Sequence, residues 1–313
     1  NVPGQASADD RSLAIHFRGL AKGRYARVVR ETLPSYRPSV GYQVMASPTL
    51  YPGQHLQAHL RAEESNSIDV DARLFVKTLG EGDELATVYG EKTKLSPGSV
   101  ESLSWTVDVP VGCPIAWVGL ELASRRRADG TVYLDSLFWS GCPDLKLDRP
   151  EHGGTGYMAA WVRACDAAHA GREHTYRLVQ NQGTGMLIQG TREWTDYVVS
   201  ARLTPHLAES VGIAARVQGL KRYYALVLTK GGRARLLREL DGTEVLAEIR
   251  YEWELYATHK LELSVEGSRI RALIDREPVF NVEDSSPLTS GGIALLVEEG
   301  RLGCDDVHVG PLR

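Results

Sequence analysis

The sequence predicts an all-β protein made of two antiparallel β-sandwiches (jelly rolls) in tandem. Apolar and polar residues alternate with a period of two through short runs, such as residues 197–203 and 213–218. Gly, Asp, Pro or Ser interrupts these runs at short intervals, which is typical of strands joined by tight turns. The length of 313 residues exceeds the usual size of one domain, so two domains are expected.

In the first half, alternating runs predict seven strands. Prolines such as Pro34, Pro97 and Pro110 fall between the runs, where the missing backbone N–H does not interrupt a ladder of hydrogen bonds. The strands are expected at residues 12–17, 25–29, 54–62, 71–78, 101–109, 116–122 and 131–139.

Three of these segments carry a resemblance to a known class of module. They are "SLAIHF" from Ser12, "LYPGQHLQAHL" from Leu50 and "GTVYLDSLFW" from Gly130. Their order resembles the galactose-binding-like jelly rolls of carbohydrate-binding modules over residues 10–141. The resemblance implies a sandwich with a sugar-binding role in the first half.

The periodicity lapses after the first half, where Pro and Gly gather. Pro143 and Pro150 are followed by the run Gly-Gly-Thr-Gly from Gly153, a composition typical of a connection between domains. We therefore expect a first sandwich at residues 1–145, a linker at 146–156 and a second sandwich at 157–313.

The second half opens on a segment, residues 158–165, that fits either one amphipathic helix or a first strand. Alternating runs then follow at residues 194–201, 212–217, 223–226, 290–295 and 304–309. They resemble the concanavalin/laminin-G-type jelly roll of the 3-keto-disaccharide-hydrolase-like family.

Both sandwiches together, with "LIQGTREWTDY" from Leu187, resemble the C-terminal region of some bacterial ADP-ribosylglycohydrolase-family proteins. The helical, metal-dependent catalytic domain of that family has no counterpart in this sequence. The resemblance therefore implies an accessory region, with a catalytic domain upstream of the residues given.

Charge and hydropathy exclude some partners. A net charge of -4 argues against attraction to nucleic acid or to an anionic membrane. No apolar run approaches the ~20 residues that a membrane span needs. The four cysteines form no CxxC pair, and buried free thiols are favoured over a disulfide such as Cys165–Cys304. The compartment is not determined, although the cytoplasm is favoured over secretion.

One acidic motif raises the alternative of a glycoside hydrolase or lyase that acts through carboxylates on the concave face of the second sandwich. Glu239, Asp241 and Glu244 match the E-x-D-x-x-E run of some jelly-roll glycosidases, and Glu193 is a further candidate. However, Asp241-Gly242 favours a hairpin turn, which would scatter the carboxylates over its tip. No catalytic residue is therefore assigned.

A saccharide-binding patch is expected on the concave face of the second sandwich. Aromatic rings stack on the apolar faces of pyranoses, while Arg, Gln and Glu side chains bind hydroxyl groups. Strand alternation predicts that such residues point away from the core. The expected ligand-binding residues are Glu193, Trp194, Arg216, Gln218, Tyr224, Arg238 and Trp253, with Trp117 facing a groove in the first half.

Acidic residues near strand ends suggest structural calcium as a cofactor. Asp305 and Asp306 close the second sandwich and Asp135 closes the first, and carboxylates with backbone carbonyls suit this cation. The alternative is a solvent-facing acidic turn.

The function expected from the sequence is non-catalytic carbohydrate binding, as accessory modules of a larger enzyme that processes glycans or ADP-ribose. The alternatives are the glycosidase or lyase described above and a purely structural role in assembly.

Overall fold

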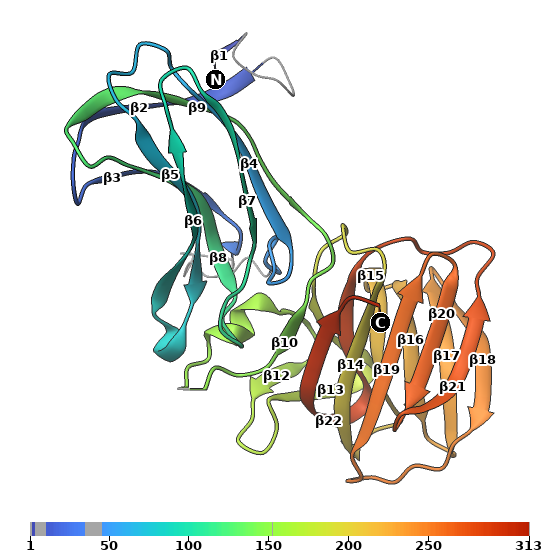
Figure 1. Cartoon of the computed structure of the whole chain (residues 1–313). Helices are drawn as coiled ribbons and strands as arrows, with labels where there is room; N and C mark the ends of the chain where they lie inside the picture. Colours follow the sequence, from blue (N-terminus) through green and yellow to red (C-terminus); the bar gives the residue numbers. More distant parts are fainter. Residues whose placement is uncertain (1, 4–10, 35–45, 152, 313) are drawn as a thin grey trace.

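The computed structural model describes residues 2–3, 11–34, 46–151 and 153–312. It confirms the predicted all-β class, because all the strand pairs of its three sheets are antiparallel. Figure 1 shows the blue-to-green strands gathered in one body and the yellow-to-red strands in another. Among the described residues, no helix has the length and hydropathy that a membrane crossing requires.

The first sandwich packs a five-stranded sheet, in the order β1-β2-β9-β4-β7, against a four-stranded sheet, in the order β3-β8-β5-β6. Alternate residues of the strands, such as Leu60, Leu74 and Leu120, meet in one core between the sheets. The strands are β1 (Val2–Pro3), β2 (Arg11–Leu20), β3 (Tyr25–Glu31), β4 (His55–Ala62), β5 (Val70–Leu79), β6 (Leu85–Leu95), β7 (Val100–Thr106), β8 (Ile115–Ala123) and β9 (Ala128–Ser140).

All seven strands predicted for this half are present, and β1 and β6 are additions. Sequence reasoning missed β6 because most of its side chains are exposed and no apolar face alternates along it. It pairs only with β5, at the edge of the four-stranded sheet. An edge strand whose side chains are mostly exposed carries little of the pattern that predicts buried strands.

The second sandwich is one continuous 13-stranded sheet that folds into two layers. Its strands are β10 (Leu145–Leu147), β11 (Val162–Ala164), β12 (Ala167–Ala170), β13 (Tyr176–Gln189), β14 (Tyr197–Leu207), β15 (Ser210–Gly219), β16 (Arg222–Thr229), β17 (Arg233–Leu240), β18 (Thr243–Arg250), β19 (His259–Glu266), β20 (Arg269–Ile274), β21 (Glu277–Glu283) and β22 (Gly292–Gly310).

Strand β22 joins the two layers. Its first part, residues 292–298, pairs with β15 and with the end of β13, whereas residues 301–310 pair with β14. Irregularities near Glu299, whose φ is 44°, bend the strand between these parts. The layers enclose a large core that contains Leu226, Leu263 and Leu295.

Two segments near the predicted linker differ from expectation. Residues 158–165 form neither one helix nor one strand, because the 3-10 helix η3 (Gly156–Ala160) precedes the short strand β11. Strand β10 begins at Leu145 and pairs with β22, so the chain joins the second sandwich at the end of the expected first sandwich, before the expected linker. The domain boundaries predicted from the sequence stay a prediction.

Tyr51 fastens the two sandwiches together. It lies in the loop before β4 of the first sandwich, but its ring is 2% exposed in the core of the second. The ring meets Trp194 edge-on with 4.7 Å between centroids, and the hydroxyl accepts a hydrogen bond of 3.0 Å from Gly190 N. Gly190 has φ 111°, and a Cβ there would lie 2.6 Å from the Trp194 ring, so only glycine fits this contact.

A second contact joins the sandwiches on another side. The carboxylate of Asp83, in the 3-10 helix η2 (Glu81–Asp83), accepts hydrogen bonds from the backbone N–H groups of Thr155 and Gly156. Ala159 of η3 packs against Leu33 and Leu79 of the first sandwich. The junction is therefore held by apolar packing and by hydrogen bonds.

We expect Tyr51→Ala to lower the free energy of unfolding by about 3–5 kcal/mol, because it empties the site of a buried ring. Tyr51→Phe keeps the ring and loses one hydrogen bond, which costs about 1 kcal/mol. Urea unfolding followed by tryptophan fluorescence measures both. Tyr256→Ala is the control, since that ring is 70% exposed. Equal losses for Tyr51→Ala and Tyr256→Ala would show that Tyr51 does not hold the junction.

Candidate functional site

The rings and the arginine at the centre of the predicted patch do not form a surface. Trp194 and Arg216 are each 1% exposed and Tyr224 is 0% exposed. A side chain without access to solvent cannot stack on a sugar. The prediction that these three residues face a ligand was therefore wrong.

Arg216 is buried because the alternation of β15 breaks at this residue. A bulge separates Ala214 from Val217 in the pairing with β22, and Arg216 has φ 50°. Its guanidinium donates hydrogen bonds of 2.6 Å to the carbonyl oxygens of Gly267 and Leu288 and of 3.0 Å to that of Thr195. A 3.0 Å ion pair with Asp196 completes the set. The Leu288 carbonyl would otherwise be a buried acceptor without a partner.

The other polar residues of the predicted patch hold a loop of the protein itself. Tyr224 Oη donates to Asp284 at 2.6 Å and accepts from Leu288 N at 3.0 Å. Arg238 donates to Asp284 at 2.7 Å, and Gln218 Nε2 donates to the Ser290 carbonyl at 2.8 Å. Residues 284–291 therefore occupy the place in which a saccharide was expected.

The remaining predicted aromatic residues lie elsewhere. Trp253 is half-buried against the core of the second sandwich, and its Nε1 donates to the Thr229 carbonyl at 2.8 Å. Trp117 packs half-buried in a separate cluster with Leu33 and Leu79. The structure does not bring these two rings to one surface with the other predicted residues.

The carboxylates of the predicted acidic motif are engaged separately. The turn at Asp241 is confirmed, since β17 ends at Leu240 and β18 begins at Thr243. Glu239 accepts a hydrogen bond from Thr243, Asp241 pairs with Arg222, and Glu244 pairs with Arg238.

The acidic residues considered for calcium also have partners within the protein. Asp305 accepts hydrogen bonds from Thr175 N at 2.7 Å and is paired with His174 at 2.6 Å. Asp306 pairs with Lys146 at 2.7 Å. Within the described part of the chain, no three His, Cys, Asp or Glu side chains form a group that could hold a metal ion. Calcium at Asp135, Asp305 and Asp306 stays a prediction.

All four cysteines are free thiols in the structure, as expected. Burial raises the pKa of Cys142 to about 11 and raises the pKa of Cys304 as well. Neither thiol is poised to ionise near neutral pH, so neither has the character of a nucleophile.

An open groove lies where the two sandwiches meet, and it includes two of the predicted ligand residues, Glu193 and Gln218. Its volume is about 640 Å³. One wall comes from β9 and the loop before β4, and the other from the end of β13, the turn after it and the end of β15. We call this hollow the junction groove. Its lining is Arg30, Ser47, Pro48, Thr49, Leu137, Phe138, Trp139, Val162, Ile188, Gly190, Thr191, Arg192, Glu193, Val217, Gln218 and Gly219.

Two aromatic side chains of β9 line the junction groove. The ring of Phe138 is 41% exposed, so it is accessible to a ligand. Trp139 is half-buried, and its Nε1 donates to the Thr49 carbonyl at 2.6 Å, which fixes the ring in place. The pairing of β9 with β2 stops at Leu134, so this end of β9 pairs only with β4.

The polar side chains of the junction groove are available for a ligand. Arg30, Arg192 and Glu193 are exposed, and none of their side chains has a hydrogen bond or ion pair with another described residue. Two cations and one carboxylate give this polar rim a formal charge of +1. The groove thus combines an exposed ring with unpaired polar groups, which is typical of ligand clefts.

Comparison with known proteins finds a similarity to a lectin domain. Residues 175–299 match the family model described as the C-terminal lectin domain of galactocerebrosidase, which is less than half of this chain. The match includes every residue that the second sandwich contributes to the junction groove except Val162. A search of curated protein sequences found no match.

Solved structures with some similarity include two from Bacillus subtilis and one from Caenorhabditis elegans. The carbohydrate-binding module CBM66 of B. subtilis is 16% identical, with 48% of this chain and 94% of the module covered and a TM-score of 0.44. A B. subtilis protein of unknown function with a galectin-like fold is 12% identical, with coverages of 50% and 91% and a TM-score of 0.40. The galectin LEC-6 of C. elegans is 13% identical, with coverages of 43% and 95% and a TM-score of 0.33. These values are too low to assign a function.

Sequence reasoning missed the wall that the first sandwich contributes. Along the chain, Phe138 is 55 residues and Arg30 is 163 residues from Glu193, and no local pattern links them. The signal that could have been found is the exposed position of Phe138, since strand alternation places it opposite the core residues Leu137 and Trp139.

We expect Arg216→Met to lower the free energy of unfolding by about 1–3 kcal/mol, because it leaves the buried Leu288 carbonyl without its donor. Hydrogen exchange should accelerate in residues 284–291, which Arg216 holds. Arg222→Met is the matched control, because its ion pair with Asp241 is exposed and is worth less than about 1 kcal/mol. Unchanged exchange in residues 284–291 would show that Arg216 does not secure this loop.

The contribution of Asp284 should depend on pH. Burial raises its pKa, but hydrogen bonds from Tyr224, Ser286 N and Arg238 outweigh burial, so the net pKa is lowered. The carboxylate therefore stabilises the fold at neutral pH, and this stabilisation is lost as the pH falls below about 4. In urea unfolding, the difference between the wild type and Asp284→Asn should shrink from pH 7 to acid pH. The exposed Asp241→Asn is the control, and a constant difference for Asp284→Asn would contradict the prediction.

Proposed function

We propose that this chain is a non-catalytic carbohydrate-binding protein whose glycan lies in the junction groove. The observation that carries the proposal is the match of residues 175–299 to a lectin domain, because these residues form one wall of that groove. The exposed ring of Phe138 and the unpaired polar groups around it supply the chemistry. A ring stacks on the apolar face of a pyranose, while the polar groups bind its hydroxyls.

The composition of the groove supports binding more than hydrolysis. Glycosidases need two carboxyl groups, about 5–5.5 Å apart in retaining enzymes and about 6.5–9.5 Å apart in inverting ones. Glu193 is the single acidic residue among the described residues that line the groove. With only one carboxylate, this lining supplies no acid and base pair.

The shape and charge of the groove narrow the class of glycan. A volume of about 640 Å³ with an open side suits several sugar units that lie along the groove. The formal charge of +1 from Arg30, Arg192 and Glu193 favours neutral or acidic glycans over basic ones. We also propose that the chain serves as an accessory region of a larger glycan- or ADP-ribose-processing enzyme.

We expect Phe138→Ala to weaken glycan binding about two- to tenfold, since ring stacking is worth about 0.5–1.5 kcal/mol. A glycan array first identifies an oligosaccharide ligand, and isothermal titration calorimetry then compares the variants. Glu193→Gln should also weaken binding by removing a charged acceptor. Tyr256→Ala is the control, because this exposed ring lies outside the groove.

Three results would contradict the proposal. Absence of binding to a broad panel of neutral and acidic glycans would remove the function. Binding that Phe138→Ala and Glu193→Gln leave unchanged would remove the site. Turnover of an oligosaccharide that Glu193→Gln abolishes would replace binding by hydrolysis.

A further inference from the structure

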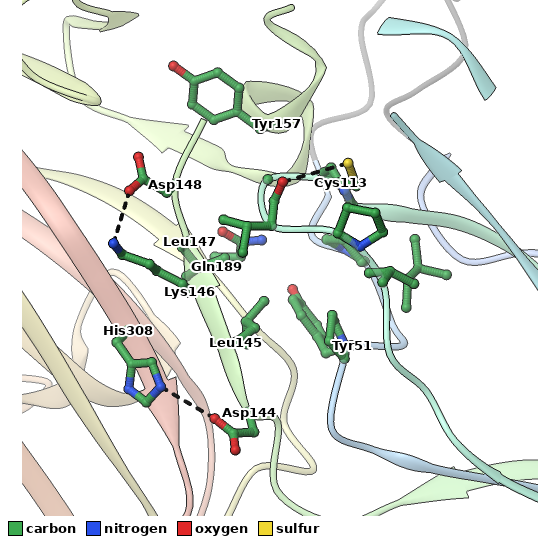
Figure 2. A pocket seen from close by; sticks show the side chains of 18 of the residues that line it. Tyr51, Cys113, Asp144, Leu145, Lys146, Leu147, Asp148, Tyr157, Gln189 and His308 are labelled. Carbon is green, nitrogen blue, oxygen red and sulfur yellow. Dashed lines mark hydrogen bonds and ion pairs between the residues drawn. The ribbon is translucent and has the colours of Figure 1, made fainter. Parts of the chain in front are cut away.

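A separate cavity of about 340 Å³ lies on the other side of the segment that contains Pro48 and Tyr51. It is formed by the loop before β4, the connection between β7 and β8, strand β10 and residues of the second sandwich. Figure 2 shows these walls facing one another, with Tyr51 and Cys113 on one side and Asp144, Lys146 and His308 on the other. We call this hollow the junction cavity.

Much of the wall of the junction cavity is apolar and rigid. The side chains of Pro48, Pro52, Pro110 and Pro114 line the part that belongs to the first sandwich. Prolines and packed rings lose little conformational freedom when they contact a ligand. The second sandwich contributes buried rings and aliphatic side chains, namely Tyr157, Trp161, Tyr176, Leu145 and Leu147.

The opposite part of the wall is polar and contains both donors and acceptors. Lys146 Nζ pairs with Asp306 at 2.7 Å and lies 3.5 Å from Asp148, while His308 Nε2 lies 3.3 Å from Asp144. The two longer ion pairs leave donor and acceptor positions that a ligand can use. Figure 2 shows both pairs along β10 and β22 at one side of the cavity.

Two acceptors in the wall have no protein partner. Asp108 is exposed, and its carboxylate forms no hydrogen bond or ion pair with the described residues. The buried Oε1 of Gln189 has no hydrogen-bond partner within the described part of the chain. An unpaired buried acceptor is costly, and a ligand hydroxyl would satisfy it.

We propose that the junction cavity binds one small, uncharged, hydroxylated ring compound, of the size and chemistry of a monosaccharide. A volume of about 340 Å³ is near the lower end for ligand pockets, so an oligosaccharide does not fit inside it. A ligand without polar groups would desolvate the charges of Lys146 and Asp148 without replacing their water. A ring with hydroxyls on one side and C–H groups on the other matches both parts of the wall.

The charges of the wall exclude an anionic ligand. Asp108, Asp144 and Asp148 face one lysine, Lys146, and one histidine, His308. With the histidine neutral, the sum is -2, which repels phosphate or carboxylate groups. This sign is opposite to the +1 of the junction groove, so the two hollows are expected to select different ligands.

The second site goes beyond the proposed function, because it shares neither Phe138 nor Glu193 with the junction groove. A ligand in the cavity contacts both sandwiches at once. By mass action it should therefore raise the melting temperature of the whole chain.

The experiment uses the full chain with methyl glucoside and methyl galactoside as probes and glucose 6-phosphate as the anionic control. Chemical-shift perturbation in NMR gives the Kd, and differential scanning calorimetry gives the change in melting temperature. At least one of the two glycosides should bind and stabilise, whereas glucose 6-phosphate should bind more weakly.

Two variants and a matched control locate the bound sugar. Val111 lines the cavity and is 51% exposed, so Val111→Trp fills the mouth without disturbing a core, and binding should be lost. Asp108→Ala should weaken binding about tenfold by removing a charged acceptor. Val100→Trp is the control, because Val100 is 69% exposed and lies outside the cavity, and its Kd should equal that of the wild type.

Three results would overturn the inference. The first is no binding of either glycoside, and the second is equal Kd values for Val111→Trp and Val100→Trp. The third is a loss of monosaccharide binding in Phe138→Ala but not in Val111→Trp, which would place the sugar in the junction groove. Oligosaccharide binding that Phe138→Ala weakens would still support the proposed function after any of these results.

Discussion

The insertion of Tyr51 into the second sandwich is the contact on which the arrangement of this protein depends. A loop of the first sandwich supplies a ring to the core of the second, where it meets Trp194 and a backbone N–H of Gly190. Burial of an aromatic ring is worth several kcal/mol, which is large beside the total stability of a protein. The same loop separates the junction groove from the junction cavity, since Pro48 lines both. Together with the contacts of Asp83 and Ala159, this anchor fixes the second wall of each hollow.

A buried polar network replaces the saccharide site that strand alternation suggested. Arg216, Tyr224 and Arg238 are chemically suited to bind hydroxyl groups, but they meet the carbonyls and the carboxylate of the protein's own loop. Buried polar groups need partners wherever they come from, and a loop that closes the end of a sandwich supplies them permanently. Residue type alone therefore cannot distinguish a ligand site from an internal hydrogen-bond network.

The junction groove and the junction cavity differ in openness and in charge, and these properties determine which ligands fit each of them. The groove is open, has an exposed ring and carries a small positive charge, whereas the cavity has a smaller volume, several buried rings in its wall and a negative charge. Both depend on residues from the two sandwiches. A protein with only one of these sandwiches would have one wall of each hollow and neither site.

The sequence by itself determined the all-β class, the seven strands first expected in the first half and the turn at Asp241, because period-two alternation and turn residues are local signals. It also identified Glu193 and Gln218, which do line the groove. Only the tertiary structure decided that Arg216 is buried, since one bulge reverses the face to which a strand residue points. It also decided that Phe138 and Arg30 face Glu193, because contacts between separate sheets depend on docking, which no local pattern encodes.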